Sequence, residues 1–301
     1  MFNIAPLRYA NILGSQSGPI ERIEYGRVDI LGSPFYQANA YLNGSLGLKK
    51  SRLQIYSNAD GSGTHRSPML ARYIAISEAL ERWAMYVICG TPKAAQYGFD
   101  VDASSNGMSA FPGLFRFQAR RKALAEAAER YCLVSWWEGL LPTKPLPASD
   151  LPIDGVEIRN PASKDRVVLI WKLSPQGYYT YGFASARKLK DAIWKAYVEM
   201  DRSLHVLDRF YKENPGFEIG DLSVIENYQE RRVVYYSLAE GHRQFQSRLS
   251  QSVSESAPSK VKPLIDCEIK GPWDRYARVW RVVLPMPTRE YLDADSNFFF
   301  W

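Results

Sequence analysis

Two segments of the sequence carry acidic and basic side chains at one shared spacing. Residues 71–84 read ARYIAISEALERWA, and residues 119–132 read ARRKALAEAAERYC. Each holds two glutamates three residues apart, followed directly by an arginine: Glu78, Glu81 and Arg82 in the first, and Glu126, Glu129 and Arg130 in the second. Carboxylate oxygens are ligands that Mg²⁺ accepts, and arginine binds carboxylates and phosphates. The pattern therefore indicates a site for a metal ion and a phosphate.

Both segments are predicted to be amphipathic helices. With about 100° between successive residues, the glutamates and the arginine share one face with alanines. In the first segment this face holds Ala71, Ala75, Glu78 and Arg82, and the apolar face holds Tyr73, Ile76, Leu80 and Trp83. The second segment has the same layout. The alanines leave room beside the carboxylates for another helix or for a ligand.

Two interpretations fit this charged face. Glu78–Arg82 and Glu126–Arg130 have the spacing of surface ion pairs, each of which stabilises a helix by about 0.3 kcal/mol. Alternatively, the two helices form a quasi-symmetric pair whose four carboxylates converge. Such carboxylates repel one another unless a cation lies between them, and Mg²⁺ arriving with nucleotide phosphates would serve. The repetition of the pattern favours the second interpretation.

A third, weaker copy spans residues 192–202, which read AIWKAYVEMDR. Ala192, Ala196 and Glu199 keep the register, but Asp201 falls on the opposite face and Arg202 takes the place of Glu81. We interpret this copy mainly as scaffold, with Glu199 as a candidate extra ligand.

The elements around these helices predict an α+β fold. Short strands are expected over residues 1–60, and further strands over 167–171, 178–183 and 278–284. A third helix is expected over 188–208. Small-residue loops at 58–64 and 105–110 precede the first two helices, and their free backbone N–H groups would suit an anion.

Composition narrows the class of protein. The 301 residues carry a net charge of +6, which suits an anionic nucleotide or an acidic peptide but includes no dense basic block for nucleic acid. Three scattered cysteines, no signal peptide and no membrane-length apolar run predict a reduced cytoplasmic setting. His65, His205 and His242 share no metal spacing, although His65 lies where it could approach phosphate. The aromatic tail, residues 298–301, is expected to pack against the body or a partner.

Taken together, these segments resemble the YcaO-domain family. Residues 63–82 are similar to the first family motif, 106–137 to the second and 181–199 to the third, and 225–236 and 281–285 fit a later helix and closing strand. The resemblance covers about residues 58–290. The chain looks like a short variant, because its first two motifs lie closer together than is usual and the tail DADSNFFFW replaces a proline-rich end.

The resemblance implies an α+β, YcaO-like fold with mixed sheets and repeated helices around an ATP and Mg²⁺ site. Residues 1–57 would be a strand-rich segment joined to a catalytic domain over 58–301. Family glutamates that hold the metal correspond to Glu78, Glu81, Glu126 and Glu129, with Arg82 and Arg130 beside them. A phosphate-facing arginine corresponds to Arg281, which could equally be a solvated strand residue.

The implied reaction is ATP-dependent modification of a ribosomally synthesised peptide such as a bacteriocin precursor, through phosphorylation of a backbone amide oxygen. The leading candidate reaction is cyclodehydration of Cys, Ser or Thr to an azoline (thiazole or oxazole type). The alternative is formation of a thioamide or an amidine. A non-catalytic scaffold of a modification complex is the alternative from another class. The expected partners are a precursor peptide, a separate leader-peptide-binding protein and a second copy in a homodimer, with no nucleic acid and no membrane.

Overall fold

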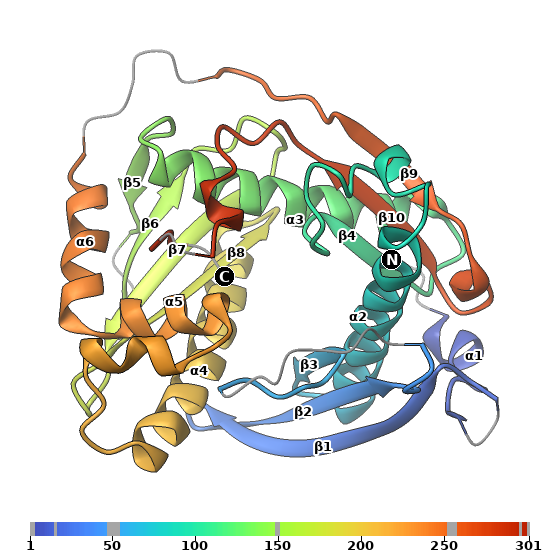
Figure 1. The fold of residues 1–301 in the computed structure, drawn as a ribbon, viewed down its shortest axis with the longest axis horizontal. Helices are drawn as coiled ribbons and strands as arrows, with labels where there is room; N and C mark the ends of the chain where they lie inside the picture. The colour runs from blue at the N-terminus through green and yellow to red at the C-terminus, as the bar shows by residue number, and fades with distance from the viewer. Residues whose placement is uncertain are drawn as a thin grey trace. The chain divides into compact units, whose positions relative to one another are not determined.

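The computed structural model describes residues 4–14, 17–46, 55–147, 151–251, 258–294 and 297–299. The chain forms two compact units (Figure 1). Unit 1 comprises residues 1–50, 58–127 and 263–284, and unit 2 comprises 51–57, 128–262 and 285–301. Helix α3 (Arg116–Trp137) begins in unit 1 and ends in unit 2.

Unit 1 contains two three-stranded antiparallel sheets. The first has the order β1-β2-β3 and the second the order β4-β10-β9. The strands are β1 (Ile20–Ile30), β2 (Ser33–Leu42), β3 (Gly61–His65), β4 (Met108–Phe111), β9 (Ile265–Ile269) and β10 (Arg278–Val283). Helix α2 (Pro68–Cys89) joins the sheets, and α1 (Ala5–Arg8), η2 (Ala95–Tyr97) and η4 (Pro272–Arg275) are short.

Helix α2 is the centre of unit 1. It begins at Ser67, whose side chain accepts a hydrogen bond from the backbone N–H of Leu70, with a proline at the first helical position. Its buried side chains pack between the sheets, against Ala40 of β2 and Met108 of β4. The helix is therefore buried on two sides, and any functional group on it must emerge at the remaining edge.

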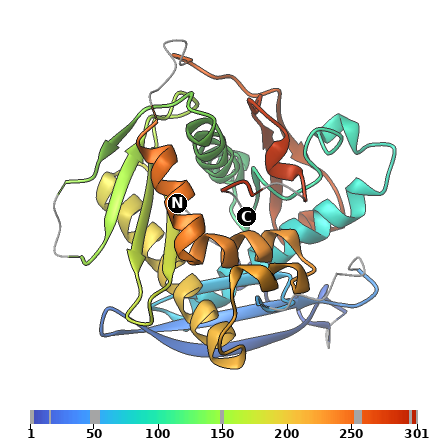
Figure 2. The ribbon, with the colours of Figure 1, turned by 60° about the vertical axis from the view of Figure 1, so that its left-hand side comes forward.

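Unit 2 is built on one antiparallel sheet with the order β5-β6-β7-β8. Its elements are β5 (Thr143–Pro145), β6 (Asp154–Ile158), β7 (Arg166–Leu173), β8 (Tyr179–Ala186), α4 (Leu189–Glu213), η3 (Ile219–Val224), α5 (Tyr228–Ser237), α6 (Ala239–Leu249) and η5 (Glu290–Leu292). Successive residues of a strand point to opposite faces. Gly182 of β8 faces α4, whereas Tyr181 stacks edge-on against Phe245 of α6, so helices cover both faces (Figure 2).

The aromatic tail is confirmed as packed where the structure describes it. Phe298 and Phe299 are buried, and Phe299 contacts Trp136, Trp137 and Tyr181 with ring centroids 5.1–5.9 Å apart. Residues 300 and 301 lie outside the described residues. Burial of these rings is the favourable alternative to leaving adjacent phenylalanines in water.

The predicted α+β class is confirmed, and the predicted strands at 167–171, 178–183 and 278–284 lie in β7, β8 and β10. The strands over 1–60 were expected to be short, but β1 and β2 have 11 and 10 residues and pair along most of their length. Residues 1–50 belong to the same compact unit as residues 58–127. The expected boundary between a segment of residues 1–57 and a domain of residues 58–301 stays a prediction.

The expectation that the segments before the first two helices are loops is wrong for most of their length, and the binding of an external anion there stays a prediction. Most of the first segment is strand β3, which pairs with β2, and much of the second is strand β4, which pairs with β10. Glycine and serine there suggested a loop, but both segments form edge strands, whose unpaired side leaves the N–H groups of Ser62 and Ala110 to donate to Glu78 and Glu81.

Candidate functional site

The sequence repeat corresponds to a repeated strand–helix packing. In unit 1, a Cβ atom on Gly61 of β3 would overlap the carbonyl oxygen of Ala75 and the backbone N of Ala79 in α2. In unit 2, a Cβ atom on Gly182 of β8 would overlap the carbonyl oxygen of Ala196 and lie 2.8 Å from the backbone N of Met200 in α4. In both pairs the strand glycine precedes its first contact by 14 residues, so the two arrangements superimpose in sequence without a gap.

This packing corrects the role predicted for the helix alanines. Ala71 and Ala75 are fully buried, and what lies close to them is strand β3, at Gly61 and Gly63. The space that the alanines leave is therefore filled by the protein's own backbone, and neither a ligand nor a second helix occupies it. A helix can approach a strand this closely only where both surfaces lack side-chain bulk.

Glu78 is fixed at the edge of this contact by two partners. One carboxylate oxygen accepts a hydrogen bond from the backbone N–H of Ser62 in β3 at 2.8 Å, and the other pairs with Arg82 at 2.8 Å. Arg82 also donates to the carbonyl oxygen of Ala59 at 3.3 Å. Both side chains keep about a third of their surface exposed. Arg82 therefore positions a carboxylate, which is one of the two roles predicted for it; the other is binding a phosphate.

Glu81 lies in the most strained electrostatic position of unit 1. Burial raises the pKa of Glu81 well above its usual range, and the charges of Glu126 and Glu78 raise it further. Lys122 and Arg82 act in the opposite direction. Its carboxylate accepts a hydrogen bond from the backbone N–H of Ala110 in β4 at 3.3 Å. Glu78, Glu81 and Glu126 thus form one interacting acidic group, which we call the unit 1 carboxylates.

Glu129 and Arg130 belong to unit 2. Burial raises the pKa of Glu129, and Arg130 and hydrogen bonds from the hydroxyl and backbone of Ser185 in β8 offset part of this rise. The Arg130 guanidinium lies 5.0 Å from the ring centre of Phe183. Glu81 and Glu129 are therefore held in the same way. Glu81 of α2 accepts a backbone N–H from β4, the strand before α3, and Glu129 of α3 accepts one from β8, the strand before α4. Convergence of Glu129 with the unit 1 carboxylates stays a prediction.

Arg281 is fully buried on β10, so the alternative of a solvated strand residue is wrong. Its guanidinium donates to the carbonyl oxygens of Asp102, Ser104 and Asn106 at 2.6–2.8 Å and lies 4.4 Å from the ring centre of Phe99. The side chain thereby fixes the segment that leads into β4, the strand that binds Glu81. The predicted contact of Arg281 with phosphate stays a prediction.

The chemistry of the unit 1 carboxylates fits a hard cation. Their mutual repulsion and burial are relieved by a positive charge placed among them, and their oxygens are donors that Mg²⁺ accepts. Among the described residues, however, no three His, Cys, Asp or Glu side chains are gathered closely enough to enclose a metal ion. A bound ion would require these side chains to close in around it.

The third copy lacks this electrostatic tension. Glu199 is about half exposed and pairs with Arg202 at 3.0 Å. Asp201 is buried on the other side of α4, 3.9 Å from Lys172. Each acid has its own cation, as the scaffold interpretation of this copy expects.

The histidines have local partners. Nδ1 of His65 accepts the backbone N–H of Ser67 at 2.9 Å, which fits the turn before α2. His242 is buried, 2.8 Å from the hydroxyl of Tyr181 and stacked on Tyr179, and burial lowers its pKa. His205 lies 3.4 Å from Asp201.

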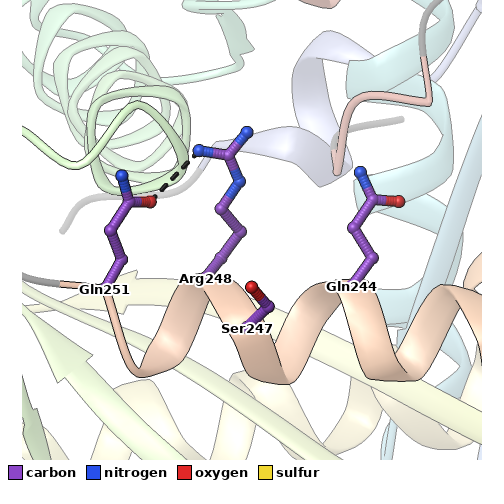
Figure 3. A pocket seen from close by; sticks show the side chains of 4 residues that line it. All are labelled: Gln244, Ser247, Arg248 and Gln251. Carbon is purple, nitrogen blue, oxygen red and sulfur yellow. Dashed lines mark hydrogen bonds between the residues drawn. The ribbon is translucent and has the colours of Figure 1, made fainter.

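A pocket in unit 2 lies along one side of α6 (Figure 3). Gln244, Ser247, Arg248 and Gln251 line it, and Arg248 donates to Gln251 at 3.1 Å. Arg248 also lies 5.0 Å from the ring centre of Trp137. None of the site residues predicted from the sequence lines this pocket.

Sequence reasoning missed the groups that hold the carboxylates. The backbone N–H groups of Ser62, Ala110 and Ser185 have no side-chain signature, because any residue except proline supplies one. Lys122 could have been found, since it precedes Glu126 by four residues and such a pair shares one helix face.

Comparisons with known proteins extend over most of the chain. No protein-family model matches the sequence, and no curated protein sequence matches it. Two solved structures share its fold. YcaO from Methanopyrus kandleri, bound with AMPPCP and Mg²⁺, aligns with a TM-score of 0.55 and 16% identity over 96% of this chain and 91% of that one. The E. coli microcin synthetase McbBCD complex with pro-MccB17 bound aligns with a TM-score of 0.51 and 15% identity, covering 87% of each chain.

Among the described residues, no helix is both long and apolar enough to cross a membrane. The resemblance inferred from the repeated glutamates is confirmed at the level of the fold. The chain folds as a YcaO-like α+β domain.

Proposed function

We propose that this chain is an ATP- and Mg²⁺-dependent enzyme that activates backbone amides of a ribosomally synthesised peptide. The observation that carries the proposal is the strained group of Glu78, Glu81 and Glu126, in which burial and like charge oppose ionisation of Glu81. Groups held at such a cost concentrate at functional sites. The likeness to a YcaO structure bound with AMPPCP and Mg²⁺ supports a metal ion that arrives with a nucleotide as the missing positive charge.

Glu78, Glu81, Glu126 and Glu129 would hold the metal, which would shield the phosphate oxygens of the nucleotide and offset the charge that develops during transfer. The protein's own groups prepare this arrangement. Ser62 and Arg82 fix Glu78, and Ala110 fixes Glu81. These hydrogen bonds restrict the starting positions of the carboxylates, which would still move closer together to enclose an ion.

Arg281 and Arg130 would act at the edges of this site. Arg281 holds the segment from Asp102 to Asn106, and the proposal assigns that segment and the arginine to the phosphate side of the nucleotide. Arg130, next to Glu129 in the sequence, would hold its carboxylate or contact a phosphate.

The leading reaction is cyclodehydration. The amide oxygen takes the terminal phosphoryl group of ATP, the side chain of a neighbouring Cys, Ser or Thr adds to the carbonyl carbon, and the oxygen leaves as phosphate. The peptide loses one water and ATP becomes ADP. Sulfide or an amine in place of the side chain would give a thioamide or an amidine. The likeness to the McbBCD complex with pro-MccB17 bound supports a peptide substrate and separate partner proteins.

One observation favours the alternative of a non-catalytic scaffold. The terminal nitrogens of Arg281 are already bound to three carbonyl oxygens, an arrangement that serves structure without any nucleotide. A scaffold would keep this contact and the strand–helix packing while having no use for ATP.

The deciding experiment measures ATP hydrolysis with and without the precursor peptide and neighbouring gene products, together with the mass of a co-expressed precursor. Loss of one water identifies an azoline, and exchange of oxygen for sulfur identifies a thioamide. Glu81→Gln and Glu126→Gln should abolish Mg-ATP binding measured by calorimetry. Glu24→Gln is the matched control, since Glu24 pairs with Arg22 on the exposed face of β1. Peptide-independent, variant-insensitive ATP turnover, or none at all, would reject the enzyme in favour of the scaffold.

A further inference from the structure

Three large apolar side chains are exposed together where the chain enters α3. Leu114, Phe115 and Phe117 expose 56%, 49% and 61% of their surface. The two phenylalanine rings stack on each other with centroids 5.6 Å apart and an interplanar angle of 19°. Single exposed apolar residues are ordinary, but a contiguous cluster marks an interaction site. We call these three residues the α3 entry patch.

The patch is held by a defined piece of backbone. Gln118 is buried, and its side-chain oxygen accepts the backbone N–H of Phe115 at 3.3 Å. A Cβ atom on Gly113 would overlap this same oxygen, so the chain folds tightly over Gln118. The buried amide fixes the loop while the aromatic rings face solvent. Such a preformed surface loses little entropy when it binds a partner.

The surroundings of the patch are basic. Residues 114–122 read LFRFQARRK, with four cations and no acid. Three acids pair with this region: Glu268 with Arg116, Lys270 and Arg278 at 2.9–3.6 Å, Asp266 with Arg120 at 2.6 Å, and Asp274 with Lys270 at 3.6 Å. Six cations in and beside the patch therefore meet three acids. Arg121 is exposed and forms no ion pair with any residue that the structure describes. Positive charge would repel a second copy of the same patch and attract an acidic partner.

We propose that the α3 entry patch binds an acidic segment of the peptide substrate that carries Leu or Phe side chains. This inference rests on the proposed function, because it assigns a substrate contact to the same site. Phe117 precedes Glu126 by nine residues of helix α3, which is about 14 Å along the axis and, at about 100° per residue, about half a turn round the helix. A path of about 22 Å along and round the helix follows, and about seven residues of extended peptide span it. A docked segment would thereby deliver the residues that follow it to the unit 1 carboxylates.

The test uses the purified full chain and a fluorescein-labelled peptide in which Leu and Phe alternate with Glu and Asp. A second probe has Lys at every acidic position. Binding is measured by fluorescence anisotropy in EDTA without nucleotide, so the result does not depend on the metal site. The acidic probe should bind saturably and more weakly as salt increases. The basic probe should bind at least about tenfold more weakly.

The double variant Phe115→Ser, Phe117→Ser should bind the acidic probe at least about tenfold more weakly than the wild type does, the loss typical of a binding hot spot. Leu7→Ser is the matched control, because Leu7 is 78% exposed on α1 of the same unit. Arg121→Glu should lower the affinity for the acidic probe and raise the affinity for the basic probe. Circular dichroism of each variant checks that the fold is intact.

Equal binding of the two probes, or equal binding by the serine variant and the wild type, would overturn the proposal. Sedimentation of the wild type without peptide measures its oligomeric state and tests the alternative that the patch joins two copies of the chain. A dimer that dissociates in the serine variant, with no probe binding, would instead make the patch a contact between copies of this chain and would also overturn the proposal. Failure of ATP hydrolysis with normal probe binding would reject the proposed function alone.

Discussion

The pair β3–α2 of unit 1 and the pair β8–α4 of unit 2 are built alike and charged differently. In both, a strand glycine lets the helix backbone approach until a Cβ atom would not fit. In unit 1, Glu78 and Glu81 join Glu126 in one strained group. In unit 2, Glu199 pairs with Arg202 much as Glu78 pairs with Arg82, but Arg202 stands where unit 1 has the acid Glu81.

This difference separates two components of the sequence repeat. Glycines and alanines recur because a helix and a strand pack closely in both places, whatever the function. The second acid of the spacing does not recur in unit 2: Glu81 of α2 is replaced by Arg202 in α4, so like charge accumulates around Glu81 but not around the ion pair of α4. The alanine pattern is thus a signal of architecture, and the second glutamate, Glu81, is the signal of chemistry.

Phe299→Ala should have the largest effect on stability and should destabilise unit 2 more than unit 1. The ring is 1% exposed and packs against Tyr181, on the face of β8 opposite α4. Its loss should cost about 3–5 kcal/mol in unfolding free energy. Hydrogen exchange should quicken in β8 and α6 more than in β3 and α2. Phe117→Ala, at an exposed ring, is the control and should change stability by less than about 0.5 kcal/mol.

Gly61→Val and Gly182→Val test whether the two packings are equivalent. Each new side chain meets helix backbone, which cannot move aside as a side chain does, so each variant should lose about 3 kcal/mol. Denaturant unfolding measures both. Gly90→Ala, where a Cβ atom meets nothing within 4 Å, should be nearly neutral. A large loss at one glycine and none at the other would mean that the two packings differ.

Glu81→Gln should raise the stability of the metal-free protein at neutral pH by on the order of 1 kcal/mol, the usual size of a single-substitution effect, because it removes a carboxylate whose ionisation is opposed by burial and like charge. The raised pKa means that the folded chain holds this proton more tightly than the unfolded chain does. Wild-type stability therefore falls as pH rises from about 4.3, the ordinary Glu value, towards the raised pKa.

Thermal unfolding across this pH range in EDTA should show a flatter curve for Glu81→Gln than for wild type. The amide oxygen of Gln can still accept the N–H of Ala110, so the backbone contact is preserved. Added Mg²⁺ and nucleotide should stabilise the wild type more than the variant. Parallel curves for the two proteins would show that the carboxylate group is not strained.

Glu199→Gln should have the smallest effect and should sharpen the contrast between the copies. An exposed ion pair such as Glu199–Arg202 contributes a few tenths of a kcal/mol, about 0.3. Stability should change little, at any pH from about 5 to 8. Loss of Mg-ATP binding in this variant would instead make Glu199 a ligand and end its assignment to scaffold.

The sequence predicted the class of fold and several elements well, for reasons that are local. A short apolar run rich in β-branched residues, such as residues 167–171, favours a buried strand from its local sequence, and the helix periodicity of residues 71–84 is independent of what the helix packs against. It misassigned residues 61–65 because glycine and serine favour loops in isolation, whereas here they are selected for close contact with α2. Tertiary packing overrode local propensity at that strand.

The candidate site was only half visible in the sequence. Glu78, Glu81 and Glu126 could be named from their spacing, because helical periodicity places them on one face. The buried position of Arg281 could not, since its partners are carbonyl groups 175–179 residues away in the chain.

The sequence alone determined which side chains carry charge, how they are spaced on their helices and where small residues permit close packing. Only the tertiary structure decided that the alanines face a strand, that Ser62 and Ala110 hold the glutamates, and that Glu81 resists ionisation. The physical reason is that spacing is a local property of one helix. Burial and the electrostatic field at a carboxylate depend on every element packed around it.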